Sequence, residues 1–232
     1  MQILAMDTAT AGCSVALWRG DDIGARRSQA MARGQSEALL PMIQDVLAEA
    51  GLTAMDLDLI AVTRGPGAFT GLRIGLSAAR AMALAAGVPC LGVDTTDVIA
   101  RGVDGSLIPG ELLVVLDTKR SDFYAQKFSC RHEALAPPVA VSPGGLAELV
   151  GPGSVDAPLM VVGDATDAAL HILSDAKIAA QAAPAPGLPD AVHLAAIAAL
   201  RWQPGQVLSP PMPLYLRPAD AKIPLDGGRL RP

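Results

Sequence analysis

Two stretches of this 232-residue chain place a carboxylate beside hydroxyl groups directly after a short apolar run. The first contains Asp7, Thr8 and Thr10, and the second contains Asp117 and Thr118. A tight turn of this kind can present N–H groups and hydroxyls to a phosphate, while an aspartate at a strand end can hold a hydrated cation. Either stretch alone is equally an ordinary hairpin with a capping aspartate. The repeat favours two facing hairpins that form a nucleotide or phosphate site.

A glycine-rich loop lies between an apolar run and a long helical pattern. It contains no Walker motif and no complete G-x-G-x-x-G fingerprint. Anions bind at such strand-to-helix loops, but the proline of this loop has no N–H to donate and no lysine follows it. We predict that the loop shapes the backbone, and an anion site is the alternative. Its residues are Arg64, Gly65, Pro66, Gly67, Phe69, Thr70 and Gly71.

Other catalytic patterns are missing from the sequence. The three histidines, His132, His171 and His193, are far apart and form no His-x-x-x-His pair, so we expect no helical metal site. No G-x-S-x-G motif marks a nucleophile. We therefore expect neither a catalytic nor a metal-binding residue in this chain.

Composition excludes several classes of protein. Hydrophobic residues make up 51% of the chain, charged residues 18%, and the net charge is −5, which argues against binding DNA or RNA unaided. No apolar stretch approaches the roughly 20 residues of a membrane span, and no signal peptide is evident. Three widely spaced cysteines favour reduced thiols and a cytoplasmic location.

Apolar periodicity predicts the elements that position these residues. Thr70 is expected to cap the helix that follows the glycine-rich loop. Strands are expected at residues 3–6, 14–18, 23–28, 57–62, 90–93, 112–116, 123–128 and 159–162, and helices at residues 36–50, 71–86, 95–100 and 189–202.

The pattern of strand, Asp-Thr, polar turn and strand occurs in both halves of the chain, which predicts a duplicated α/β fold. Glycine and proline cluster over residues 101–110 and mark a boundary. We predict one lobe over residues 1–104, carrying the partner-binding helices, and another over residues 105–232, whose last helix could pack back on the first lobe.

Three segments together resemble the TsaB family, also called YeaZ. They are residues 3–10 (ILAMDTAT), 36–43 (SEALLPMI) and 64–75 (RGPGAFTGLRIG), and the likeness is specific over residues 1 to about 100. Further on it is weaker, although PLYLR at residues 213–217 is similar to a C-terminal motif of the family.

The resemblance implies the two-lobed actin/hexokinase-like ATPase (ASKHA) fold, with mixed β-sheets flanked by helices. It also implies a non-catalytic subunit of the cytoplasmic tRNA-processing machinery that makes N6-threonylcarbamoyladenosine beside the anticodon of tRNAs reading codons that begin with A. The partners would be the catalytic TsaD and the ATPase TsaE, with a homodimer when the partner is absent. The chain would reach tRNA only through the complex and would not contact membranes or DNA. It would bind no cofactor tightly, and ATP and a metal are expected on the partner subunits.

The family pairs through its first two long helices, which here carry a set of apolar candidates. The helix that follows the glycine-rich loop adds two arginines seven residues apart, which form either a partner-facing or nucleotide-facing stripe or a solvated helix edge. The candidates for the interface are Leu39, Leu40, Ile43, Leu47, Leu72, Arg73, Leu76, Arg80 and Leu84.

Two alternatives remain open at the level of sequence. The paired aspartates Asp7 and Asp117 fit an independent kinase of the same fold. A peptidase is supported only by an older family name, and a purely structural homodimer is the remaining possibility.

Overall fold

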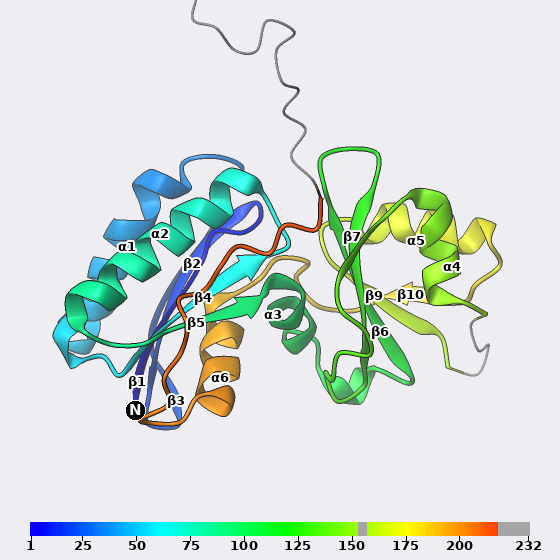
Figure 1. The fold of residues 1–232 in the computed structure, drawn as a ribbon. Coiled ribbons are helices and arrows are strands. Elements are labelled where there is room, and N and C mark those ends of the chain that lie inside the picture. Colours follow the sequence, from blue (N-terminus) through cyan, green and yellow to red (C-terminus); the bar gives the residue numbers. More distant parts are fainter. Residues whose placement is uncertain (153–156, 218–232) are drawn as a thin grey trace, which may run out of the picture.

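The computed structural model describes residues 1–152 and 157–217 and places them in two α/β lobes (Figure 1). Among these residues no helix is both long and apolar enough to cross a membrane. The elements of the first half are β1 (Gln2–Asp7), β2 (Gly12–Arg19), β3 (Asp22–Ala30), α1 (Gln35–Ala50), the 3-10 turn η1 (Ala54–Asp56), β4 (Leu59–Gly65), α2 (Phe69–Ala86), β5 (Cys90–Asp94) and α3 (Thr95–Arg101).

The second half continues with elements of the same kinds. They are the 3-10 turn η2 (Gly105–Leu107), β6 (Glu111–Asp117), β7 (Phe123–Ser129), β8 (Val139–Val141), α4 (Pro143–Val150), β9 (Leu159–Val162), α5 (Thr166–Asp175), β10 (Ala180–Ala182) and α6 (Ala191–Arg201).

The two sheets have the same topology. The first has the order β3-β2-β1-β4-β5, and the second, read in the same sense, has the order β8-β7-β6-β9-β10. In each, the central strand pairs antiparallel with the strand that follows it in the chain and parallel with the next strand on its other side. The predicted duplicated, two-lobed actin/hexokinase-like fold is therefore confirmed.

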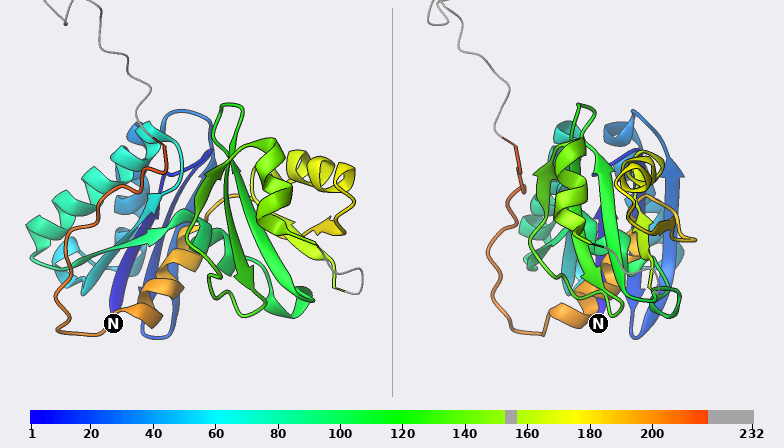
Figure 2. Two further views of the ribbon diagram at one scale, coloured as in Figure 1. Left: turned by 45° about the vertical axis from the view of Figure 1, so that its right-hand side comes forward. Right: turned by 90° about the vertical axis from the view of Figure 1, so that its right-hand side faces the viewer.

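The central strands of the first sheet are covered on both faces, which explains why β1 and β4 are mostly apolar, whereas the edge strand β3 is mostly exposed. Successive side chains of a strand point to opposite faces. Leu4 and Met6 of β1 pack under α1 and α2, whereas Ile3 and Ala5 pack against α6. Helix α6 is nearly the last element in the chain, yet it lies against the first lobe (Figure 2).

Helix α3 joins the two lobes. Val98 belongs to the core beneath α6, whereas Ile99 and Ala100 belong to the core of the second sheet, with Leu112 and Val114 of β6. Because one short helix is buried in both cores, the lobes share packing rather than a flexible linker.

A last extended segment, residues 211–217, runs across the first lobe and reaches the second (Figure 1). The N–H of Leu214 donates to the carbonyl of Arg64 at 2.7 Å. At the far end, the Arg217 guanidinium pairs with Asp122 at 2.8 Å, in the turn between β6 and β7.

Helix α2 begins earlier than the sequence predicts. Its N-cap is Ala68 and its first residue is Phe69, so Thr70 lies in the first turn and does not cap the helix. The physical reason is tertiary: the N–H of Ala68 donates to the carbonyl of Ala9 at 2.7 Å, which fixes the helix start against the first hairpin.

The loop and the start of α2 approach the first hairpin so closely that only glycine fits. A Cβ on Gly67 would overlap the carbonyl oxygen of Ala9, and a Cβ on Gly71 would overlap that of Thr8. The missing side chains let two backbone segments pack directly on each other.

Gly71→Ala is expected to lower the free energy of unfolding by about 1–3 kcal/mol, because the backbone must shift to admit a methyl group. Urea unfolding followed by circular dichroism measures this change. Gly144→Ala in α4 is the matched control, since nothing lies within 4 Å of the added carbon. It should leave stability unchanged or slightly higher, and equal stability of both variants would contradict the packing argument.

Candidate functional site

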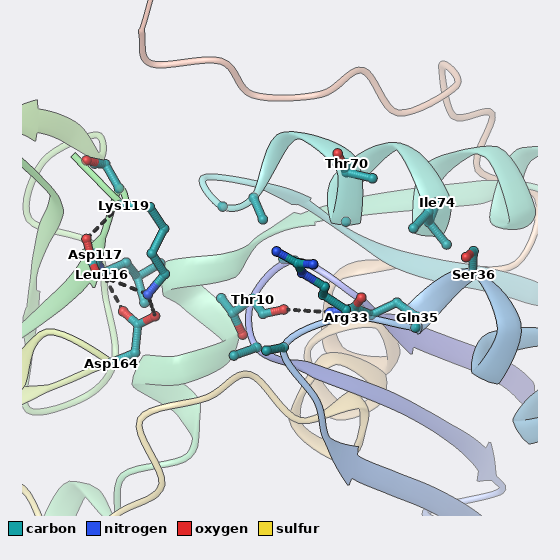
Figure 3. A pocket seen from close by; sticks show the side chains of 18 residues that line it. Thr10, Arg33, Gln35, Ser36, Thr70, Ile74, Leu116, Asp117, Lys119 and Asp164 are labelled. Carbon is teal, nitrogen blue, oxygen red and sulfur yellow. Dashed lines mark hydrogen bonds and ion pairs between the residues drawn. The ribbon is translucent and has the colours of Figure 1, made fainter.

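The two Asp-Thr hairpins face each other across a cleft of about 520 Å³ between the lobes (Figure 3). Thr10 lines it from the first lobe, and Asp117 and Thr118 line it from the second. Asp7 and Thr8 do not line the cleft, because both are buried beneath it. The structure thus brings together only part of the predicted pair of hairpins.

Asp7 is fully enclosed, with an exposed fraction of 0%. One carboxylate oxygen, Oδ1, accepts hydrogen bonds from the Thr63 hydroxyl at 2.6 Å and from the Ala9 N–H at 3.1 Å. Its other oxygen, Oδ2, is buried with no hydrogen-bond partner among the described residues. Burial raises the pKa of this carboxyl to about 7, against the opposing effect of those hydrogen bonds. A carboxyl that is about half protonated at neutral pH and shielded from water is a poor ligand for a hydrated cation.

Thr8 acts as a structural tie rather than a phosphate donor. Its hydroxyl donates to the carbonyl of Gly71 at 2.7 Å, which joins the first hairpin to α2. A Cβ on Gly75, one turn later, would lie only 2.7 Å from the same hydroxyl oxygen. The glycines of this helix face therefore hold the hairpin in place through backbone contact.

The first-lobe wall of the cleft favours anions. Arg33 and the N-terminus of α1 line it, and the N-cap Gly34, with φ of 98°, supplies no side-chain cap. Unsatisfied N–H groups at a helix start carry partial positive charge. Thr10 is 9% exposed, and its hydroxyl is buried with no hydrogen-bond partner among the described residues.

On the second-lobe wall, a lysine pairs with two carboxylates of the same wall. The Lys119 ammonium lies 3.0 Å from Asp117 Oδ2 and 3.8 Å from Asp164 Oδ2. The hydrogen bond to Asp117 raises the pKa of Lys119. Burial works to raise the pKa of Asp117, but its hydrogen bonds with Lys119 outweigh that effect and the pKa falls. Burial raises the pKa of Asp164, although the Asp117 N–H donates to it at 2.8 Å.

Arg33, Lys119 and Asp164 are residues of this cleft that the sequence alone did not single out. Asp164 had a usable signal, since it follows a buried apolar strand, as Asp117 does. Strands β6 and β9 are parallel, so their carboxyl ends meet at one edge of the sheet. Arg33 had no such signal, because it lies in the loop before α1.

No group of three or more histidine, cysteine, aspartate or glutamate side chains placed to hold a metal ion occurs within residues 1–152 and 157–217. The cleft instead pairs a positive wall with a wall of two carboxylates, of which the single charge of Lys119 can balance only one. Such an arrangement can hold an anionic group against the start of α1.

Most of the apolar residues predicted for the partner interface face the sheet, so the prediction is corrected for them. A helix over a sheet turns its most regular apolar stripe inward, and these residues form that stripe, with exposed fractions below 9%. The buried members are Leu39, Ile43, Leu47, Leu72 and Leu76.

The remaining interface candidates lie at the surface. Leu40 is 54% exposed and Leu84 is 85% exposed, and Arg73 and Arg80 are also exposed. Leu84 borders an apolar groove of about 530 Å³ that is also lined by Val88, Pro89, Leu208 and Pro210.

The glycine-rich loop divides into a buried and an exposed part. Gly65, Pro66 and Gly71 are buried, Arg64 and Gly67 are half-buried, and Phe69 and Thr70 are exposed. Tyr215 stacks on Phe69 with 5.5 Å between ring centroids, and the Arg73 guanidinium lies 3.7 Å from the Phe69 centroid. This stack fixes the position of Arg73 on the surface of α2.

Comparisons with known proteins agree with this fold. Residues 28–225 match the profile of the family described as TsaD, tRNA N6-adenosine threonylcarbamoyltransferase. The chain is 39% identical over 124 residues to the tRNA threonylcarbamoyladenosine biosynthesis protein TsaB of Escherichia coli, an alignment that covers 53% of this chain and about half (53%) of that relative's length. It is 35% identical over 222 residues to an uncharacterized protein of Mycobacterium tuberculosis, covering 95% of this chain and 93% of the relative. The solved structure of YeaZ from Pseudomonas aeruginosa is similar with a TM-score of 0.74 at 26% identity, over 93% of this chain and 99% of that one.

The buried carboxyl of Asp7 predicts a pH dependence of stability. Unfolded aspartate loses its proton near pH 3.9, whereas folded Asp7 keeps it up to about pH 7. Between these values the folded state binds more protons, so stability falls as pH rises and levels off above pH 7. Asp7→Asn does not titrate, so its stability relative to wild type should rise by roughly 3–4 kcal/mol between pH 4 and pH 8.

Urea unfolding of both proteins across this pH range measures the difference. Asp45→Asn, on the exposed face of α1, serves as the control. A stability difference between Asp7→Asn and wild type that stays constant with pH would show that Asp7 is ionised in the folded protein.

Proposed function

We propose that this chain, which belongs to the TsaB (YeaZ) family, is a non-catalytic subunit. It pairs with TsaD in N6-threonylcarbamoylation of tRNA, and TsaE is a further partner. The E. coli relative carries a name in this pathway, and the matched family profile is described by the same tRNA modification. A role on tRNA also fits the predicted cytoplasmic location.

The observation that carries the pairing proposal is the presence of an exposed leucine on each of α1 and α2, one of them beside an apolar groove. Leu84 is 85% exposed beside an apolar groove, and Leu40 is 54% exposed on the neighbouring helix. A large apolar side chain in contact with water gains free energy when a partner covers it. Arg73 and Arg80 are exposed on the same helix, and Arg80 also lines the groove, so both can supply charged contacts to a partner.

The state of the cleft supports a non-catalytic role. Asp7, the residue that would hold a hydrated cation, is enclosed and shifted toward its protonated form. Lys119 is occupied by two carboxylates rather than free for a phosphate. Both features fit a nucleotide fold kept for its shape, with ATP and a metal held by the partner subunits.

Leu84→Glu and Leu40→Glu should each weaken association with the cognate TsaD by a few kcal/mol, because each would bury an unpaired charge. A loss of about 2.8 kcal/mol is roughly a hundredfold rise in Kd. Calorimetry or a sizing column with purified proteins measures this. Leu200→Glu on α6, where the leucine is 76% exposed, is the matched control and should pair normally.

Two results would count against the pairing proposal. If the wild-type chain fails to associate with TsaD at micromolar concentration, with both proteins folded, the proposed function is wrong. Normal pairing by both glutamate variants moves the interface away from α1 and α2. Without the partner, we expect the wild-type chain to sediment as a homodimer at high concentration.

Titration of ATP and Mg²⁺ into the isolated chain should give no saturable binding at micromolar concentration, since the enclosed Asp7 cannot reach a hydrated cation. Calorimetry measures this directly. Tight binding that Asp7→Ala abolishes would instead favour an independent kinase of the same fold.

A further inference from the structure

A second, smaller pocket of about 160 Å³ lies at the end of the molecule opposite the hairpin turns. Strand β7 runs away from the hairpin at Phe123 and ends at Ser129, and Arg131 and His132 follow it into this pocket. Helices α3 and α6 pack against each other (Figure 1). Residues of both helices supply the other walls. Three segments far apart in sequence therefore converge on one site.

The pocket is strongly basic for a chain whose net charge is −5. Its lining includes Arg101, Arg131 and Arg201 but only one carboxylate, Asp97. Arg201 pairs with Asp97 at 2.6 Å. Arg101 and Arg131 are exposed, and neither forms an ion pair with a carboxylate among the described residues. Two guanidinium groups thus remain available at one small cavity.

The turn that carries Arg131 is held in place. His132 has a φ of 61°, and its Nε2 lies 2.8 Å from the carbonyl oxygen of Val103, in the loop after α3. The Ser129 hydroxyl accepts hydrogen bonds from the N–H groups of Arg131 and Glu133, both at 3.2 Å. The positions of the walls are therefore set before any ligand arrives.

Close packing brings the turn against η2, the 3-10 turn that follows α3. A Cβ on Gly105 would lie 2.7 Å from the carbonyl oxygen of Cys130, so a larger residue there would push the turn outward. The approach depends on tertiary structure and creates the cavity between the turn and α6.

Helix-dipole compensation explains only part of the cluster. Arg101 and Arg201 lie in the last turns of α3 and α6, where cations are favourable. Arg131 lies in a turn outside any helix, so no helix dipole explains the position of its guanidinium. Its placement beside the other two is the feature that points to a ligand.

The size and chemistry of the pocket select the ligand class. A volume of about 160 Å³ is below the roughly 300–1,000 Å³ of sites that enclose whole small molecules. Guanidinium groups match phosphate oxygens in a two-point geometry. A single phosphate group therefore fits, held by Arg101 and Arg131, with the rest of its molecule outside.

We propose that this pocket binds a phosphate of an RNA backbone, an inference that rests on the proposed role in tRNA modification. An acidic protein segment would need an apolar surface alongside the charges, and the only exposed apolar residue of the lining is Leu200. The overall charge of the chain keeps this contact too weak to hold RNA unaided, so it acts within the complex, at the end of the molecule away from the hairpin cleft.

The test uses the complex of this chain with its cognate TsaD and full-length tRNA. In Arg101→Gln/Arg131→Gln, the Kd for tRNA should rise roughly five- to tenfold near 0.1 M salt, similarly for different tRNA sequences. The slope of log K against log salt should become shallower by about one, the change expected for one lost phosphate contact. Arg19→Gln/Arg26→Gln removes two exposed arginines from β2 and β3 and should change neither quantity.

The possible results test the pocket proposal separately from the proposed function. If the double variant pairs with TsaD but binds tRNA with unchanged Kd and salt slope, the pocket proposal is wrong and the proposed function stands. If the wild-type pair does not form or does not bind tRNA, both fall. Replacing chloride by inorganic phosphate at equal ionic strength tests the same site: phosphate that weakens tRNA binding by wild type but not by the double variant supports the proposal. Saturable binding of inorganic phosphate at low millimolar concentration that the double variant loses, together with an unchanged Kd for tRNA, would instead assign the pocket to free phosphate.

Discussion

The direct contact between two backbone segments, the first hairpin and the glycine-rich loop, determines the geometry of the first lobe. The N–H of Ala68 donates to Ala9, and the Thr8 hydroxyl donates to Gly71. Glycines at positions 67 and 71 make the contact possible because any Cβ there would overlap a carbonyl oxygen. From this contact follow the start of α2, the burial of Asp7 and the shape of one wall of the cleft.

The duplicated lobes have diverged at equivalent positions. Both aspartates end the central strand of their sheet, yet Asp7 is enclosed and Asp117 faces the cleft. The difference arises because the first hairpin is covered by the glycine-rich loop, whereas the second is left open and its aspartate is paired with Lys119. One topology therefore produces two electrostatic environments, and the cleft loses the symmetry expected of a phosphate clamp.

Different surfaces of the molecule suit different partners. The outer faces of α1 and α2 expose isolated leucines, a surface suited to another protein. The far end of α3 and α6 concentrates guanidinium groups, a surface suited to phosphate. Because α3 is buried in both cores, these surfaces are fixed relative to each other, which suits a subunit that positions other components.

The sequence by itself determined the fold class, the order of the elements in the first half of the chain, and the family, because those depend on apolar periodicity and on three contiguous motifs. It missed β8, α4, α5 and β10 of the second half, which are all short. It also indicated the hairpins correctly as local patterns. Only the tertiary structure decided that Leu39 and Leu72 face the sheet while Leu40 and Leu84 face water, since the direction of a helical stripe depends on what the helix packs against. The same holds for the burial of Asp7 and for the basic pocket, whose arginines are up to 100 residues apart in the chain. Side chains from distant segments meet only when the lobes pack, and no local pattern records that meeting.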